Sequence, residues 1–245
     1  MLEVRNLSFG SVVRDVSFTL HAGEILGIAG LIGSGRTELA LTIFGITPAT
    51  AGEVLVDGRA VRIESPQQAR DLGIAYVPED RGLQGLVRPQ SIQENISLTV
   101  LKSLATGTLI DHRKEERLAR DAIAKFGIRA RGPRQIVRQL SGGNQQKVVL
   151  AKWLATEPRI LIMDEPTRGI DVGAKSEIHA LMSALAARGL GILMISSELP
   201  EVLGMSDRVL VMKNGTLVAE FDRADATAEA VGAAMTLANA SGEAA

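Results

Sequence analysis

Cysteine is absent from this 245-residue chain, and aromatic residues make up only 3% of it. Without cysteine no disulfide framework can form, and a reducing compartment is expected. No run of about 18 apolar residues occurs, which argues against a membrane-spanning helix. The first residues also lack the apolar segment of a secretory signal. A role at a membrane would therefore have to come through a partner.

An excess of charge is also missing, since the net charge is −1. This balance gives no strong field toward nucleic acid or anionic lipid, so neither is expected as a partner. Among the basic residues, 20 Arg stand against 7 Lys, and no lysine precedes Lys102. Hydrophobic residues make up 46% of the chain, enough to bury a full core.

Apolar runs alternate with helical patterns along the chain, which is typical of an α/β protein with a mostly parallel sheet. Short continuous apolar runs predict strands that are buried on both faces. These runs are Glu24–Ala29, Ile74–Val77, Ile160–Met163, Gly191–Ser196 and Arg208–Met212. Val16–Leu20 alternates like an edge strand, and Asn214-Gly215 predicts a tight hairpin before Leu217–Phe221.

Helix signals divide the rest of the chain. Ser65 followed by Pro66 predicts a helix start, and Gly73 ends that helix. Arg113–Lys125 reads as a helix with a solvated charged face, closed by Gly127. We therefore expect one domain over 1–245. It would have an α/β core at about 1–90 and 157–223, a helical insert at about 91–156, and a weakly patterned tail at 224–245.

A glycine-rich turn between a strand and a helix has the layout of a phosphate-binding loop. It runs from Gly30 through Gly33, Ser34 and Gly35 to Thr37. Such glycines let backbone N–H groups converge on an anion, and the helix N-terminus adds its dipole. Thr37 is placed to bind Mg²⁺.

The loop departs from the usual pattern at Arg36, where lysine is expected. A guanidinium is bulkier than an ammonium and points differently at the β- and γ-phosphates. Glu38 follows and adds negative charge near a bound phosphate. Taken without the motifs further along the chain, this segment has an alternative interpretation as a glycine-rich turn without a ligand.

Two further segments carry chemistry. Ser141-Gly142-Gly143-Asn144-Gln145 opens a helix, whose N-terminus predicts a second anion site because bare glycine is costly within helices. Downstream, an apolar strand ends in Asp164 and Glu165, at the edge where open α/β sheets bind ligands. We expect Asp164 to hold Mg²⁺ through water and Glu165 to polarise an attacking water. The alternative, that these carboxylates merely cap a strand, is weakened by the Ser-Gly-Gly helix just upstream.

The chain resembles ATP-binding-cassette (ABC) ATPases over nearly its whole length. Four motifs occur in the order typical of that family: the phosphate loop, the Leu-Ser-Gly-Gly signature, the Asp-Glu-Pro strand and the Gly169-Ile170-Asp171 segment. Finer features resemble the C-terminal, degenerate cassette of ribose-, galactose- and xylose-type importer subunits. These are 35–39 (GRTEL), 78–81 (PEDR), 144–147 (NQQK), 166–175 (PTRGIDVGAK) and 196–198 (SSE). The resemblance implies a P-loop NTPase core with an antiparallel β edge subdomain and a helical insert.

The resemblance also implies which residues of its own ATP site are altered. Glu79 stands where a glutamine usually senses Mg²⁺ and the permease, and Ser197 stands where a histidine usually contacts the γ-phosphate. The signature is nearly intact, with Asn144 for the usual glutamine, and Asp171 lies in the D-loop position. Phe9 is the nearest candidate for the aromatic that stacks on adenine, although a core or edge-strand role fits it equally. His21, His112 and His179 align with no site position.

In the resembled family two cassettes meet head to tail, and each ATP lies between one phosphate loop and the other signature. This chain is therefore expected to bind ATP and Mg²⁺ poorly at its own site and to complete a partner cassette's site. The implied partners are that second cassette, transmembrane permease subunits and, indirectly, an extracytoplasmic sugar-binding protein. The implied location is the cytoplasmic face of a bacterial plasma membrane. A non-hydrolysing regulatory cassette and a soluble ABC ATPase remain alternatives, and whether the chain is a separate subunit or half of a longer one stays open.

Overall fold

The computed structural model describes residues 1–107 and 109–236. Within these residues a central six-stranded sheet has the order β12–β11–β3–β10–β9–β6, and every neighbouring pair is parallel except β11 and β12. The bounds of its strands are β3 Ile25–Gly30, β6 Ile74–Val77, β9 Ile160–Asp164, β10 Gly191–Ile195, β11 Arg208–Lys213 and β12 Thr216–Asp222. The five predicted buried runs are the parallel strands of this sheet.

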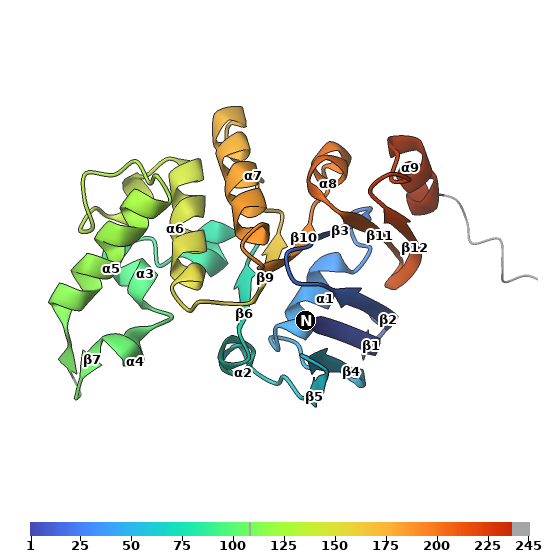
Figure 1. The fold of residues 1–245 in the computed structure, drawn as a ribbon, viewed down its shortest axis with the longest axis horizontal. Helices are drawn as coiled ribbons and strands as arrows, with labels where there is room; N and C mark the ends of the chain where they lie inside the picture. The colour runs from blue at the N-terminus through green and yellow to red at the C-terminus, as the bar shows by residue number, and fades with distance from the viewer. Residues whose placement is uncertain (108, 237–245) are drawn as a thin grey trace, which may run out of the picture.

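A second, antiparallel sheet in the described part of the chain has the order β2–β1–β4–β5. Its strands are β1 Leu2–Phe9, β2 Val13–Leu20, β4 Ala51–Val56 and β5 Arg59–Val61. The predicted edge strand is the second half of β2, which does lie at an edge of this sheet. In Figure 1 these strands, blue for β1 and β2 and teal for β4 and β5, lie below the central sheet, beside α1. The mostly parallel core, the antiparallel β subdomain and the helical insert of the predicted fold class are thus confirmed.

Helices cover both faces of the central sheet. Above it in Figure 1 lie α7, α8 and α9, and below it lies α1. The strands alternate between two cores accordingly: Ile192 and Met194 pack with the α7 and α8 side, whereas Leu193 and Ile195 pack with α1 and the antiparallel sheet. The bounds of these helices are α1 Arg36–Ile43, α7 Val172–Ala186, α8 Leu199–Met205 and α9 Ala228–Thr236. A further helix, α2 Pro66–Asp71, packs on the α1 side through Ala69.

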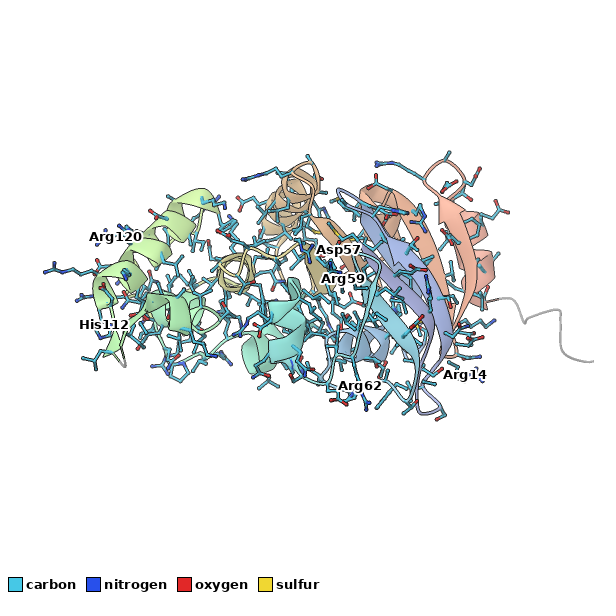
Figure 2. The ribbon with its side chains drawn as sticks, turned by 60° about the horizontal axis from the view of Figure 1, so that its bottom comes forward. Arg14, Asp57, Arg59, Arg62, His112 and Arg120 are labelled. Atoms are coloured by element: carbon cyan, nitrogen blue, oxygen red, sulfur yellow. The ribbon has the colours of Figure 1, made fainter. Side chains whose placement is uncertain are left out.

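A group of helices fills one end of the elongated molecule, green to yellow in Figure 1. Its elements are α3 Ile92–Ser97, α4 Leu101–Leu104, β7 Ala105–Thr106, β8 Leu109–Ile110, α5 His112–Lys125, η2 Val137–Gln139 and α6 Gly142–Leu154. The short β7–β8 hairpin has no counterpart in the sequence prediction. On α5, His112 and Arg120 project from the end of the molecule, as expected of a solvated face (Figure 2). Glu115 is an exception, because it is buried and accepts a hydrogen bond from the Ser97 hydroxyl at 2.7 Å.

Local signals mark several boundaries as predicted. The Ser65 hydroxyl accepts a hydrogen bond from Gln68 N at 3.3 Å, which caps α2. Asn214 and Gly215 have φ of 46° and 83°, as a two-residue hairpin turn between β11 and β12 requires. The predicted tail forms α9, and residues 237–245 lie outside the described part. No helix in the described residues is long and apolar enough to cross a membrane.

Candidate functional site

The phosphate-loop segment leaves β3 at Gly30 and enters α1 at Arg36. Gly33 and Gly35 have φ of 81° and 98°, a left-handed conformation that side chains rarely adopt. A side chain at Gly35 would also strike the carbonyl of Val12 in the β1–β2 turn. The loop therefore needs glycine for its own shape, and that shape places the open N-terminus of α1 at the end of the sheet.

The loop borders a pocket of about 560 Å³. Most of the predicted nucleotide-binding residues line it: Gly33, Ser34, Gly35, Arg36, Thr37, Glu38, Glu79, Glu165 and Ser197. Gly30 and Asp164 are buried next to this lining, at the ends of β3 and β9. Ser34 Oγ is buried, and no partner is found for it among the described residues. An unpaired hydroxyl beside a helix N-terminus suits an anion such as a phosphate.

Arg36 lines the pocket and is anchored to the end of β10. Its side chain is buried, and Nη1 donates to the backbone carbonyl of Ser196 at 2.5 Å. Burial lowers the pKa of Arg36, while the charges of Glu165 and Asp164 oppose that shift. The guanidinium thus links the phosphate loop to the end of β10, a contact that the sequence did not predict.

Asp164 is fully buried at the end of β9. Its Oδ2 accepts a hydrogen bond from the Tyr76 hydroxyl at 3.3 Å, whereas no partner is found for Oδ1 among the described residues. Burial raises the pKa of Asp164 to about 6, and the nearby Thr37 hydroxyl pulls it the other way. A carboxylate oxygen and a hydroxyl are hard oxygen donors of the kind that Mg²⁺ takes together with phosphate oxygens and water. Thr37 and Asp164 therefore fit this metal.

Glu165 follows in a strained conformation, with φ of 49°. Its backbone N–H donates to Ile195 O at 2.8 Å, and its Oε2 accepts a hydrogen bond from the Ser197 hydroxyl at 3.1 Å. Burial raises the pKa of Glu165, and the Ser197 hydrogen bond opposes the shift. Glu165 and Ser197, predicted separately from two motifs, are thus in direct contact.

Glu79 is paired with Arg168, a residue of the 166–175 motif for which the sequence predicted no role. Arg81, two residues after Glu79, donates hydrogen bonds to Arg168 O at 2.7 Å and to Gly169 O at 2.9 Å. These bonds fix the segment after β6 against the segment before α7. Sequence reasoning missed Tyr76 altogether. Arg81 and Arg168 lie in the quoted motifs at 78–81 and 166–175, but nothing in the local pattern indicated their contacts with partners about 90 positions away.

The signature segment lies outside the phosphate-loop pocket, at the start of α6. Ser141 is exposed, and its hydroxyl accepts a hydrogen bond from Asn144 Nδ2 at 2.8 Å. Asn144 Oδ1 in turn accepts from Arg129 N at 2.7 Å, and Gln145 Nε2 donates to Leu140 O at 2.9 Å. Asn144 and Gln145 therefore hold the loop that leads into the helix.

Gly142 and Gly143 have a packing role that the ligand argument overlooked. A β-carbon at Gly142 would strike the Arg81 guanidinium, and one at Gly143 would strike the Ala174 methyl group on α7. Contacts within the chain thus favour glycine at both positions, most strongly at Gly143, because the Ala174 methyl group cannot turn away as the end of the Arg81 side chain can. Asp171, predicted in the D-loop, caps α7 by accepting from Ala174 N at 2.9 Å.

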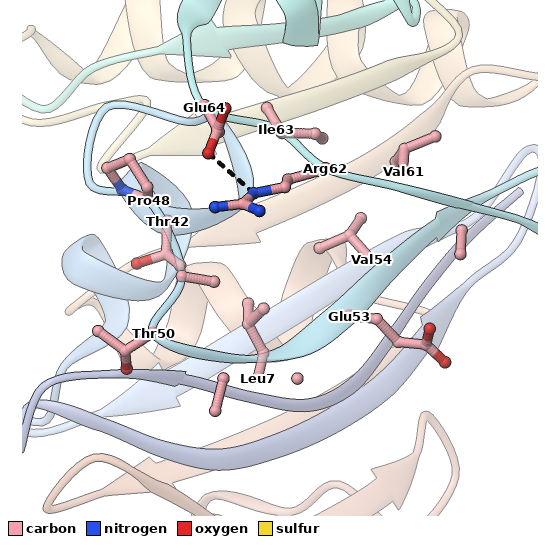
Figure 3. Close-up of a pocket in the computed structure, with 14 residues that line it drawn as sticks. Leu7, Thr42, Pro48, Thr50, Glu53, Val54, Val61, Arg62, Ile63 and Glu64 are labelled. Carbon is pink, nitrogen blue, oxygen red and sulfur yellow. Dashed lines mark ion pairs between the residues drawn. The ribbon is translucent and has the colours of Figure 1, made fainter.

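A hollow of about 500 Å³ lies elsewhere, between α1 and the antiparallel sheet. Figure 3 shows the Arg62–Glu64 pair, at 2.8 Å, among its charged side chains. Its lining lacks the loop glycines and the strand-end carboxylates that meet in the phosphate-loop pocket. Phe9 is half-buried and packs against the core formed by α1 and the antiparallel sheet. Its proposed contact with adenine stays a prediction.

Comparison with known proteins decides the family. The profile described as "ABC transporter" matches residues 13–168. The chain belongs to the ABC transporter family. It is 53% identical to a "Ribose import ATP-binding protein RbsA 1" of Rubrobacter xylanophilus, over 100% of this chain and 49% of that protein. It is 54% identical to an "RbsA 2" of Streptomyces avermitilis, over 96% of this chain and 46% of that protein.

A solved structure described as a nucleotide-free ATP-binding cassette from an ABC transporter is similar in fold. It has a TM-score of 0.76 and 26% identity, and the match covers 91% of both chains. The ABC domain thus spans about half the length of the ribose-import proteins that it matches.

Proposed function

We propose that this ABC domain binds Mg-ATP and serves a bacterial monosaccharide importer. The observation that carries the proposal is the meeting of phosphate loop, Asp164, Glu165 and Ser197 around one pocket. Sugar import follows from the relatives, which are named for ribose import. The resemblance adds transmembrane permease subunits, an extracytoplasmic sugar-binding protein and a location at the cytoplasmic face of the plasma membrane. The near-neutral charge disfavours nucleic acid.

The chain's own site is proposed to bind nucleotide and to hydrolyse it slowly. Backbone N–H groups at the start of α1 would cradle the phosphates, and Thr37 and Asp164 would hold the metal. Mg²⁺, when bound, neutralises charge on the phosphate oxygens. Glu165 orients the attacking water, but the neighbouring Ser197 cannot supply the charge that a histidine would. Arg36 Nη1 donates to Ser196 O, so the guanidinium offers fixed positive charge beside the pocket in place of the compact ammonium of a lysine.

The signature is proposed to act in trans. Ser141 is exposed at the start of α6, and Gly142 and Gly143 are fixed against Arg81 and Ala174. This helix start would close on the ATP held by the phosphate loop of a second cassette. In that arrangement the chain contributes to hydrolysis at its partner's site more than at its own.

A non-hydrolysing regulatory cassette is the second candidate, favoured by the Arg36–Ser196 bond and by Ser197, which stands where a histidine usually contacts the γ-phosphate. Calorimetry of the chain with Mg-ATP tests the shared claim of nucleotide binding. Loss of a charge-assisted contact costs on the order of 1.5–3 kcal/mol, or about ten- to a hundred-fold in affinity relative to a lysine-bearing loop. Sub-micromolar affinity would contradict the proposed weak site. ATPase activity that rises when a complete partner cassette is added would favour the transporter cassette over the non-hydrolysing one.

A further inference from the structure

Glu201, on α8, is a buried carboxylate outside the nucleotide pocket, with only 6% of its surface exposed. Both of its oxygens are engaged. Oε2 accepts a hydrogen bond from the Ser196 hydroxyl at 2.5 Å, and Oε1 lies 2.7 Å from His179 Nε2. A buried carboxylate is costly unless it is hydrogen-bonded, and these two contacts supply that compensation. His179, Glu201 and Ser196 thus form one polar connection between α7, α8 and the end of β10.

The same connection reaches the phosphate loop. Ser196 is itself buried, and its carbonyl accepts the hydrogen bond from Arg36 Nη1. Its hydroxyl also accepts from Glu198 N at 3.0 Å. Ser196 is therefore held at its side chain by Glu201 while its backbone holds Arg36. A chain of contacts runs from His179 to the guanidinium without passing through any residue of the signature.

The role of this connection is inferred from the residues at its two ends. One end is Arg36, which stands in the phosphate loop where a lysine is expected, and its charge lies beside Asp164 and Glu165. The other end, His179, lies on α7, which begins directly after Asp171. We propose that His179, Glu201 and Ser196 are positioning residues that hold Arg36 against the end of β10 and thereby set how tightly the pocket holds ATP. The nucleotide part of this inference rests on the proposed function.

The direction of the effect follows from charge. Arg36, held in place, offsets two carboxylates that would otherwise face the phosphates. When Ser196 loses its anchor, the guanidinium is less well fixed and the carboxylates repel the ligand more. Loss of the Ser196 hydroxyl should therefore weaken ATP binding by about three- to ten-fold, the size expected for one hydrogen bond.

A double-mutant cycle tests whether the effect passes through Arg36. Mg-ATP affinity is measured by calorimetry for the original chain, Ser196→Ala, Arg36→Met and the double variant. We expect the Ser196→Ala loss to shrink to less than about two-fold in the Arg36→Met background, since residues that act through one another are non-additive. An equal loss in both backgrounds, or no loss in either, overturns the inference. Ser103→Ala, which removes an exposed hydroxyl on α4, serves as the matched control and should change nothing.

A second arm needs no nucleotide. Thermal unfolding of the same four proteins should give melting-temperature shifts that do not add, and additive shifts would overturn the network. His179→Leu should reproduce the Ser196→Ala behaviour, and His179→Gln, whose amide can still donate to Glu201, should restore it. If the original chain fails to bind ATP at all, the proposed function fails, while this unfolding arm still decides whether the network holds Arg36.

Discussion

The phosphate-loop pocket and the signature segment differ in what they bury. The pocket buries charge: Asp164 is fully enclosed, Arg36 is 7% exposed, and Glu165 adopts a strained backbone conformation. The signature segment instead packs closely against its neighbours, because Gly142 and Gly143 have no side chains and leave room for Arg81 and Ala174. The first region is therefore expected to cost stability for the sake of binding, and the second to contribute packing while it presents an exposed Ser141.

The largest effect expected from this contrast is on hydrolysis. The lining of the pocket contains Arg36 and Ser197 where the resemblance expects a lysine and a histidine, and each lost donor can cost about a hundred-fold in rate. We expect very slow ATPase from the chain alone. Arg36→Lys by itself should not restore it, because Glu79 and Ser197 remain. Brisk turnover of the isolated chain that Glu165→Gln abolishes would show that the pocket is catalytic after all.

Stability should respond to the buried Asp164. Burial raises its pKa to about 6, above its value of about 3.9 in an unfolded chain. The folded state then binds more protons than the unfolded state between about pH 4 and 6, so stability falls as the pH rises through that window. At neutral pH the charge costs about 2–3 kcal/mol, which Asp164→Asn should recover. Urea unfolding at pH 5 and 7.5 checks this, and a destabilised Asn variant at pH 7.5 would contradict it.

The signature glycines should respond in the opposite way. Gly143→Ala places a methyl group against Ala174 and should cost about 1–3 kcal/mol of unfolding free energy through overpacking. Gly204→Ala is the matched control, since this helical glycine on α8 has open space around its missing β-carbon. That control should be neutral or stabilising by up to about 1 kcal/mol. Equal behaviour of the two variants in urea unfolding would remove the packing argument.

The smallest expected effect concerns Tyr76. Tyr76→Phe removes only the hydroxyl that anchors Asp164 Oδ2 and should cost about 1 kcal/mol in the binding of Mg-ATP. Binding of ATP in the presence of a chelator should change less, because Asp164 then holds no metal. Phe44→Leu disturbs the ring that lies 5.3 Å from Tyr76 and keeps the hydroxyl, so it controls for packing. A parallel loss with and without Mg²⁺ would assign Tyr76 a structural role only.

The contrast between the two regions also separates what the sequence predicted from what it did not. The phosphate loop, the strand ending at Asp164 and the Asn214-Gly215 hairpin depend on neighbouring residues, and the structure has them at the predicted positions. Local pattern is sufficient there, because φ preference and apolar periodicity act over a few residues.

Contacts between distant segments were not predictable in this way. The Arg36–Ser196 bond joins residues 160 positions apart, and Tyr76 and Asp164 are 88 apart. The glycine pair shows a further limit: bare glycine near a helix start suggested a ligand, but the facing Arg81 and Ala174 are visible only in the fold. Glu115 likewise sits in a charged run and is nevertheless buried.

The central claim, that the signature serves a partner's site while the chain's own pocket is secondary, is tested most directly in a reconstituted two-cassette assembly. Its ATPase is measured with Ser141→Arg and with Glu165→Gln, each alone. Ser141→Arg places a bulky cation at the exposed start of α6 and should abolish hydrolysis by blocking closure, whereas Glu165→Gln should cost the assembly far less. If Glu165→Gln silences the assembly and Ser141→Arg leaves it active, the roles assigned to the two regions are reversed.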